Sequence, residues 1–167
     1  MSEHPITLTV NGVTHSLNIP ARMTLADVLR ERLDVTSPHL GCEHGVCGAC
    51  TILLNGSAVR SCITLAMQAD GAEIRTVEGF VSDPGLRRIQ EAFLEYHATQ
   101  CGFCTPGFMA SLAELFADGG RPTREQALEA CAGCLCRCTG YINIVHAVDA
   151  LLASEDSKSI DASQADG

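Results

Sequence analysis

Eight of the ten cysteines in this 167-residue chain form two groups of four that differ in spacing. The first group is Cys42-x4-Cys47-x2-Cys50 followed by Cys62. The second group is Cys101-x2-Cys104 followed, much later in the chain, by Cys136-Arg137-Cys138. Cysteine thiolates are soft ligands that hold zinc or iron–sulfur clusters. Two groups of four therefore predict two metal centres.

The spacing of the first group is that of a plant-type [2Fe-2S] site. Structural zinc sites usually take their ligands from two short knuckles. Here Cys42 extends one knuckle and Cys62 stands alone, so iron–sulfur is favoured over zinc. His44 lies inside the loop, but a Rieske site needs two histidines in short Cys-His spacings, and no second such pair exists. We therefore interpret His44 as a solvated or hydrogen-bonded loop residue.

Six cysteines compete for the second site. Cys101-x2-Cys104 with Cys131-x2-Cys134 would make a good pair of zinc knuckles. Spacing alone does not exclude that pairing. The residues themselves therefore leave two ligand sets open for this half of the chain.

The composition narrows the class of protein. Hydrophobic residues make up 46% of the chain, which is typical of a globular protein. The formal net charge of −9 offers no phosphate-binding surface, so we expect neither nucleic acid nor an anionic membrane as a partner. The sequence has no secretory signal pattern and no apolar stretch long enough to span a membrane. Ten thiols in such a chain favour metal ligation over disulfides, and we expect a cytoplasmic protein.

The first half of the chain has the alternating pattern of strands. Asn11-Gly12 and Asn55-Gly56 each separate two apolar runs and are typical of type I′ hairpin turns. Thr24 has the position of a helix N-cap. The predicted elements are a hairpin over 6–19, a helix over 24–34, a hairpin over 51–62 and a strand over 73–77. They describe a compact α+β sheet domain over residues 1–79.

The second half has helical spacing. A linker is predicted over residues 79–85, and Thr105-Pro106 and the Thr123/Gln126 capping box indicate two helix starts. A last helix is predicted from near Tyr141 to Ala153. Residues 80–153 should therefore form a domain of four short helices. Residues 154–167 are almost free of apolar side chains and predict a disordered tail.

Three segments carry a family resemblance. They are Gly41–Thr51 (GCEHGVCGACT), Gln100–Gly107 (QCGFCTPG) and Leu135–Tyr141 (LCRCTGY). Together they resemble the small iron–sulfur subunit of the molybdenum hydroxylases of the xanthine oxidase and carbon monoxide dehydrogenase family, over about residues 5 to 153. The resemblance implies an α+β fold, with an N-terminal β-grasp ferredoxin domain followed by an all-α four-helix bundle. Each domain would hold one [2Fe-2S] cluster.

The resemblance also implies the ligands. One set, for the cluster nearer FAD, is Cys42, Cys47, Cys50 and Cys62, and the other, for the cluster nearer the pterin, is Cys101, Cys104, Cys136 and Cys138. Gln100 matches a glutamine that hydrogen-bonds the pterin, so Gln100 and Cys138 are expected on the pterin side. Cys134 stands where the family usually has Asn, and Cys131 where an aliphatic residue is common. We predict that neither of these two is a ligand.

The implied function is electron transfer inside a larger enzyme. A large subunit would carry molybdenum on molybdopterin cytosine dinucleotide, and a medium subunit would carry FAD, with the assembly a dimer of heterotrimers. Electrons would pass from molybdenum through this chain to FAD while a substrate is hydroxylated, and the loop at 43–46 resembles hydroxylases of N-heteroaromatic rings. Two other functions fit the composition: an independent soluble two-cluster ferredoxin and a zinc-stabilised interaction module. No substrate site is expected on this chain.

Overall fold

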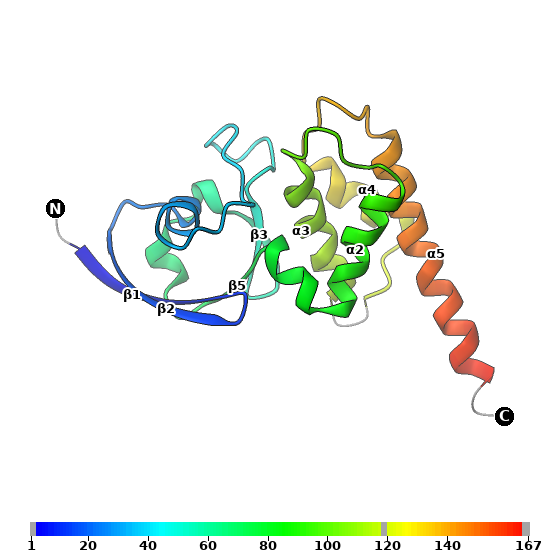
Figure 1. The fold of residues 1–167 in the computed structure, drawn as a ribbon, viewed down its shortest axis with the longest axis horizontal. Helices are drawn as coiled ribbons and strands as arrows, with labels where there is room; N and C mark the ends of the chain where they lie inside the picture. The colour runs from blue at the N-terminus through cyan, green and yellow to red at the C-terminus, as the bar shows by residue number, and fades with distance from the viewer. Residues whose placement is uncertain (1–2, 118–119, 165–167) are drawn as a thin grey trace.

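A computed structural model describes residues 3–117 and 120–164, the last ten of these by their backbone only. A sheet domain and a helical domain lie side by side, and the cysteine-bearing loops gather on one edge of the molecule (Figure 1). The chain is thus an α+β ferredoxin-like domain followed by a helical domain, as the sequence predicted.

The sheet domain contains five strands in the order β2-β1-β5-β3-β4. The strands are β1 (Glu3–Val10), β2 (Val13–Pro20), β3 (Thr51–Leu54), β4 (Ser57–Arg60) and β5 (Glu73–Arg75). All pairs are antiparallel except β1 with β5, which is parallel. Both predicted hairpin turns are confirmed, because Asn11, Gly12, Asn55 and Gly56 all have positive φ.

The predicted helix after Thr24 consists of two short pieces. Thr24 caps it by accepting a hydrogen bond from the Asp27 N–H. The α-helical turn α1 (Leu25–Asp27) continues into a π-helical segment, η1 (Val28–Arg32). The apolar face of this segment is buried against the sheet, together with strand residues such as Leu8 and Ile74.

Strand β3 joins the two domains because both of its faces are buried. Ile52 belongs to the core of the sheet domain, and the next residue, Leu53, belongs to the core of the helical domain. Successive strand side chains point to opposite faces, so one short strand serves two cores. The helix packed against β3 is α3 (Thr105–Phe116).

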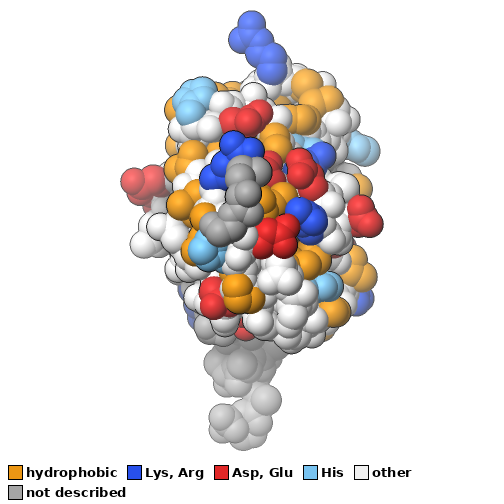
Figure 2. Space-filling view, turned by 90° about the vertical axis from the view of Figure 1, so that its left-hand side faces the viewer, with side chains coloured by type: hydrophobic (Ala, Val, Ile, Leu, Met, Phe, Trp, Pro, Cys, Tyr) orange, Lys and Arg blue, Asp and Glu red, His pale blue; other side chains and the backbone are white. Residues whose placement is uncertain are grey.

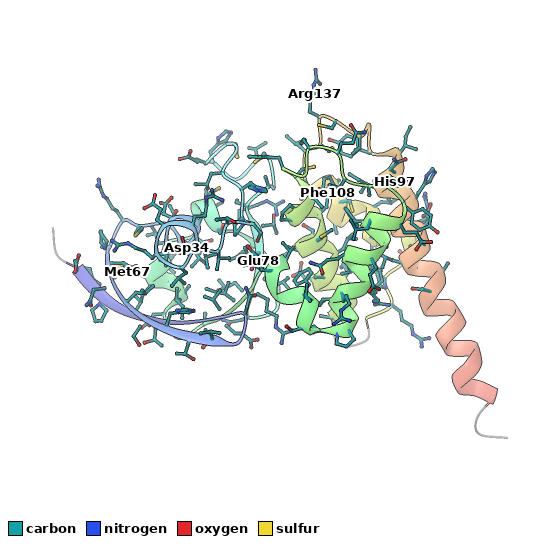
Figure 3. The ribbon with its side chains drawn as sticks, viewed as in Figure 1. Asp34, Met67, Glu78, His97, Phe108 and Arg137 are labelled. Atoms are coloured by element: carbon teal, nitrogen blue, oxygen red, sulfur yellow. The ribbon has the colours of Figure 1, made fainter. Side chains whose placement is uncertain are left out.

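The helical domain also contains α2 (Pro84–Glu95), α4 (Arg124–Ala132) and α5 (Ile142–Gln164). Its core includes Phe93 and Phe108, and Phe108 points into the domain (Figure 3). The predicted capping box of Thr123 and Gln126 is confirmed. At α3 the N-cap is Cys104 rather than Thr105, which instead is the first residue of the helix.

Two segments differ from their prediction. The predicted linker over 79–85 is ordered, because it comprises the end of a 3₁₀ segment, η4 (Val77–Ser82), and the start of α2, and Phe80 is fully buried. The predicted end of α5 at Ala153 is wrong, and a helix takes the place of the expected tail as far as Gln164, since no Gly or Pro interrupts this stretch. Residues 165–167 lie outside the described residues. The exact division at residue 79 stays a prediction.

One face of the molecule carries charges of both signs (Figure 2). On the face at the β1–β2 end, acidic and basic side chains are interspersed with hydrophobic ones and no basic patch is visible (Figure 2). Within the part of the chain that the structure describes, no helix is long and apolar enough to cross a membrane.

Candidate metal centres

The first four cysteines are brought together by one loop and the end of a hairpin. The loop over 42–50 runs directly into β3, and Cys62 follows β4. Cys50 and Cys62 are buried, whereas Cys42 and Cys47 are half-buried. Glu43, Gly45 and Gly48 have positive φ, which lets the loop curl so that its thiols converge.

The thiols of the first group act on one another in pairs. Among the cysteines, Cys50 acts most strongly on the Cys62 thiol, and Cys47 acts on the Cys42 thiol. The Cys47 N–H also donates to the Cys42 sulfur at 3.4 Å. The group therefore consists of an inner pair and an outer pair.

The second four cysteines come from two loops at helix ends. Cys101 and Cys104 precede α3, while Cys136 and Cys138 lie between α4 and α5. Cys104 is paired with Cys136, and both are buried. Cys101 is paired with Cys138, and both are exposed. This site repeats the arrangement of the first, with an inner and an outer pair.

The thiols of each site match the number of ligands that a two-iron cluster takes. A [2Fe-2S] cluster takes four cysteines, two for each iron. Each site offers four cysteines, two of them in more buried positions and two nearer the surface. A tetrahedral zinc ion also takes four thiolates, so the number of ligands alone fits either centre.

The thiols of each site differ in acidity. At the first site, the N–H of Cys47 lowers the pKa of Cys42 to about 6, whereas burial and the neighbouring Cys50 raise the pKa of Cys62 to about 12. At the second site, burial and the neighbouring Cys136 raise the pKa of Cys104 to about 12. Burial also opposes ionisation of Cys136, but hydrogen bonds from Thr139 outweigh it and hold the Cys136 pKa below its ordinary value.

Cys131 and Cys134 belong to neither proposed ligand set, although Cys134 contacts the loop of the first site. They are neighbours of each other, and both are buried in the core of the helical domain. The Cys134 sulfur is 3.7 Å from the Ser111 hydroxyl and 3.8 Å from the carbonyl oxygen of Gly48, to which it donates. Among the cysteines, Cys136 and Cys101 act on Cys104, whereas Cys134 acts on Cys131. This favours the ligand set with Cys136 over the zinc-knuckle alternative; the ligand set itself stays a prediction.

The two cysteine loops contact each other directly. The Leu135 N–H donates to the Cys47 carbonyl at 2.9 Å, so residues next to or within the two thiol groups share a hydrogen bond. On the other side, His39 stacks on Phe103 with ring centroids 4.8 Å apart, and its Nδ1 donates to the Phe103 carbonyl at 2.8 Å. The two candidate centres are thus adjacent.

Two glycines, Gly48 and Gly107, allow this close approach. A Cβ on Gly48 would lie 2.4 Å from the Gly133 carbonyl oxygen, and a Cβ on Gly107 would lie 2.2 Å from the Gly48 carbonyl oxygen. The loop of the first site is therefore held between the first turn of α3 and the end of α4. Side chains at these positions would separate the domains.

The remaining predicted residues lie on the outer surface. Gln100 is exposed beside Cys101. Arg137 points away from the body of the molecule (Figure 3). His44 donates from Nδ1 to the Cys42 carbonyl at 2.5 Å, which confirms it as a hydrogen-bonded loop residue.

Sequence reasoning missed the residues that join the two sites. Arg60 donates to the Thr51 hydroxyl of its own hairpin and to the Gly133 carbonyl of the helical domain. Position 60 and position 133 are far apart in the chain, and no short-range pattern connects them. The signal in the sequence is limited to Gly48 and Gly133, which lie beside cysteines, because glycine allows another segment of backbone to approach closely.

Comparisons with known proteins agree with this geometry. Residues 8–77 match the family model of the 2Fe-2S iron–sulfur cluster binding domain, and residues 76–149 match that of the [2Fe-2S] binding domain. Two [2Fe-2S]-binding domains therefore account for most of the chain.

Related proteins match along nearly their whole length. The nicotine 6-hydroxylase small subunit of Paenarthrobacter nicotinovorans is 57% identical over 143 residues, covering 86% of each chain. Caffeine dehydrogenase subunit gamma of Pseudomonas sp. (strain CBB1) is 49% identical over 153 residues, covering 89% of this chain and 90% of that one. In the crystal structure of quinoline 2-oxidoreductase from Pseudomonas putida 86, one chain superposes with a TM-score of 0.84 at 42% identity, covering 94% of this chain and 98% of that one. The chain therefore belongs to the family of small [2Fe-2S] subunits of molybdenum hydroxylases related to xanthine oxidase.

Proposed function

We propose that this chain carries electrons from a molybdopterin centre in a large subunit to FAD in a medium subunit. The helical domain, as a four-helix bundle, would receive them, and the β-grasp domain would pass them on. The observation that carries this proposal is the adjacency of the two thiol groups, joined by the hydrogen bond between Leu135 and Cys47. A bound [2Fe-2S] cluster takes up and releases one electron at a time.

The ligand assignment is part of the proposal. One cluster is held by Cys42, Cys47, Cys50 and Cys62, and the other by Cys101, Cys104, Cys136 and Cys138. The pairing into inner and outer thiols supports it, as do the hydrogen bonds that Cys134 makes with Ser111 and Gly48 rather than with a cysteine. In each site the outer pair faces the surface and the inner pair anchors the cluster to the core.

Two matched substitutions test the ligands. Cys136→Ser should remove one of two clusters, halving the iron and acid-labile sulfide content and abolishing one electron paramagnetic resonance (EPR) signal. Cys134→Ser should keep both clusters, because a serine hydroxyl can still donate to the Gly48 carbonyl. Loss of a cluster from Cys134→Ser would contradict the assignment.

The partners are proposed from the surface around the cysteines. Exposed apolar side chains gather on the cysteine segments and just beside them, and they include Val46, Ile63, Phe103, Leu135 and Tyr141. An apolar rim of this kind is expected where larger subunits cover a site permanently, and it is unfavourable for an independent carrier. Gln100, beside the exposed Cys101 and Cys138, would hydrogen-bond the pterin cofactor, molybdopterin cytosine dinucleotide. The whole enzyme would be a cytoplasmic dimer of heterotrimers.

The proposed substrate class is N-heteroaromatic compounds. Nicotine, caffeine and quinoline, which name the relatives described above, all contain nitrogen heteroaromatic rings. The substrate itself would bind in the large subunit. This chain would contribute electron removal after each hydroxylation.

Purification from the native host tests the proposal. We expect the chain to elute with two larger chains, molybdenum, FAD and four iron atoms per copy of this chain. Adding an N-heteroaromatic substrate anaerobically should then produce two EPR signals of reduced [2Fe-2S] clusters. A chain that elutes alone with both clusters would instead be an independent ferredoxin, and a colourless zinc-containing sample would overturn the proposal entirely.

A further inference from the structure

Arg60 lies at the junction of the two candidate metal centres. It is the last residue of β4, and its side chain is part-buried between the domains. Its Nη1 donates to the Thr51 hydroxyl at 2.5 Å, and its Nη2 donates to the Gly133 carbonyl at 2.6 Å. The guanidinium of Arg60 is thus hydrogen-bonded to both domains.

Both atoms belong to segments that carry cysteines. Thr51 follows Cys50 directly, and its hydroxyl also donates to the Gly48 carbonyl at 2.5 Å, inside the loop of the first site. Gly133 precedes the segment 134–138, which bears the inner and outer thiols of the second site. The planar fork of arginine fixes two acceptors at once, which a lysine does not do.

The hydrogen-bond partners of the positively charged Arg60 side chain are neutral. Both acceptors of Arg60 are uncharged oxygens, and none of the ion pairs among the described residues involves Arg60. Burial raises the pKa of the Cys134 thiol, and the positive charge of Arg60 opposes that rise, so the field of Arg60 reaches the junction. Clusters held by four thiolates are anionic, so a cation between two of them favours their reduced, more negative forms.

We propose that Arg60 is a positioning residue that fixes the separation of the two cysteine-bound clusters and raises the electron affinity of both. The inference rests on the proposed ligand assignment. It adds to that assignment a residue outside both cysteine groups, which acts through Thr51 and Gly133 and through its own charge.

Two substitutions of Arg60 separate charge from position. In the iron-loaded protein, purified with any chains that accompany it, Arg60→Gln removes the charge. At a fixed applied potential the ratio of reduced to oxidised cluster should then fall about threefold to tenfold for both EPR signals. Arg60→Lys keeps the charge but loses the fork. It should leave that ratio near the wild-type value while changing the magnetic splitting between the two reduced clusters, which depends steeply on their distance.

A substitution on the opposite side of the contact gives an independent test. Gly133 has φ −72° and ψ −4°, so alanine fits its backbone without strain. A Cβ there would lie 2.7 Å from Nη2 of Arg60, and the guanidinium would have to move. Gly133→Ala should therefore reproduce the change in splitting while Arg60 is present. It also keeps the test available if Arg60→Gln does not fold.

The control is Arg124→Gln, which removes an exposed arginine paired with Asp149 on the helical domain. It should change neither the ratio nor the splitting.

Unchanged ratios in Arg60→Gln, with four irons per chain, would overturn the role of the charge. Unchanged splitting in both Arg60→Lys and Gly133→Ala would overturn the positioning role. A wild-type protein lacking two [2Fe-2S] signals would instead overturn the proposed function.

Discussion

The two candidate metal centres reach the same arrangement by different routes. Three thiols of the first site come from the single loop over 42–50, which folds on itself through residues with positive φ. The thiols of the second site come from two loops at helix ends, so helix packing has to bring them together. A local site and a non-local site thus both end with one buried pair and one outer pair.

The difference extends to the groups around the sulfurs. At the first site, the hydrogen bond to the Cys42 sulfur comes from the backbone N–H of Cys47. At the second site, the Cys136 sulfur accepts from both the N–H of Thr139, at 3.4 Å, and its hydroxyl, at 3.1 Å. The sulfur at the first site thus accepts from a backbone donor, whereas the sulfur at the second site accepts from a side-chain donor as well.

The largest expected effect is that of Gly48→Ala, which would break the contact between the sites. Gly48 has φ +78°, and a Cβ would lie 2.4 Å from the Gly133 carbonyl oxygen. Strain and collision with backbone should together cost more than about 3 kcal/mol of unfolding free energy. Urea unfolding monitored by circular dichroism, together with iron content, measures this.

Gly56→Ala is the matched control. Gly56 has φ +87°, but a Cβ there meets nothing within 4 Å. It should cost about 1 kcal/mol through backbone strain alone. Equal losses for the two variants would show that the close approach of the domains does not depend on Gly48.

Thr139→Ala should alter the second site alone. Removing the hydroxyl leaves the Cys136 sulfur with less hydrogen bonding, which disfavours the reduced cluster. A loss of about 1 kcal/mol corresponds to about 40 mV for one electron, so one midpoint potential should fall by roughly that amount. Redox titration followed by EPR measures both potentials, and Thr139→Ser should restore the wild-type value. Equal shifts in both signals would argue against independent tuning.

The smallest effect is expected at Glu78, which lies near the junction of the domains (Figure 3). Its carboxylate accepts from the Ser37 N–H at 2.8 Å, from the Ser37 hydroxyl and from the Thr76 hydroxyl at 2.5 Å. Burial alone would raise the Glu78 pKa, but these hydrogen bonds outweigh it and hold the pKa below its ordinary value of 4.5.

A lowered folded pKa means that this stabilisation is complete above about pH 5 and is lost as the pH falls through the folded pKa. Because Glu78 is exposed to solvent, Glu78→Gln should cost only about 0.5 kcal/mol at pH 7 and flatten the loss of stability below about pH 5. Thermal unfolding between pH 3 and pH 7 measures this, with Glu91→Gln on α2 as control. An unchanged pH profile in Glu78→Gln would contradict the role assigned to this carboxylate.

Local signals predicted the elements well where neighbouring residues decide the conformation. The Asn-Gly turns, the Thr24 cap and the Thr123/Gln126 capping box are all present, because each depends on contacts within a few residues. Prediction failed where contacts with residues distant in the chain decide the structure. Phe80 lies in a segment rich in turn residues, yet it is buried because the helical core extends over the linker.

By itself the sequence determined the family and indicated the candidate sites: cysteine spacing marks the first group, and the motifs that resemble one family imply the second. Only the tertiary structure decided how the sites meet. Cys50 immediately precedes β3 and Cys104 immediately precedes α3, so packing of that strand against that helix sets the two loops edge to edge. Contacts such as that of Arg60 with Gly133 join positions distant in the chain, and no local sequence pattern predicts them.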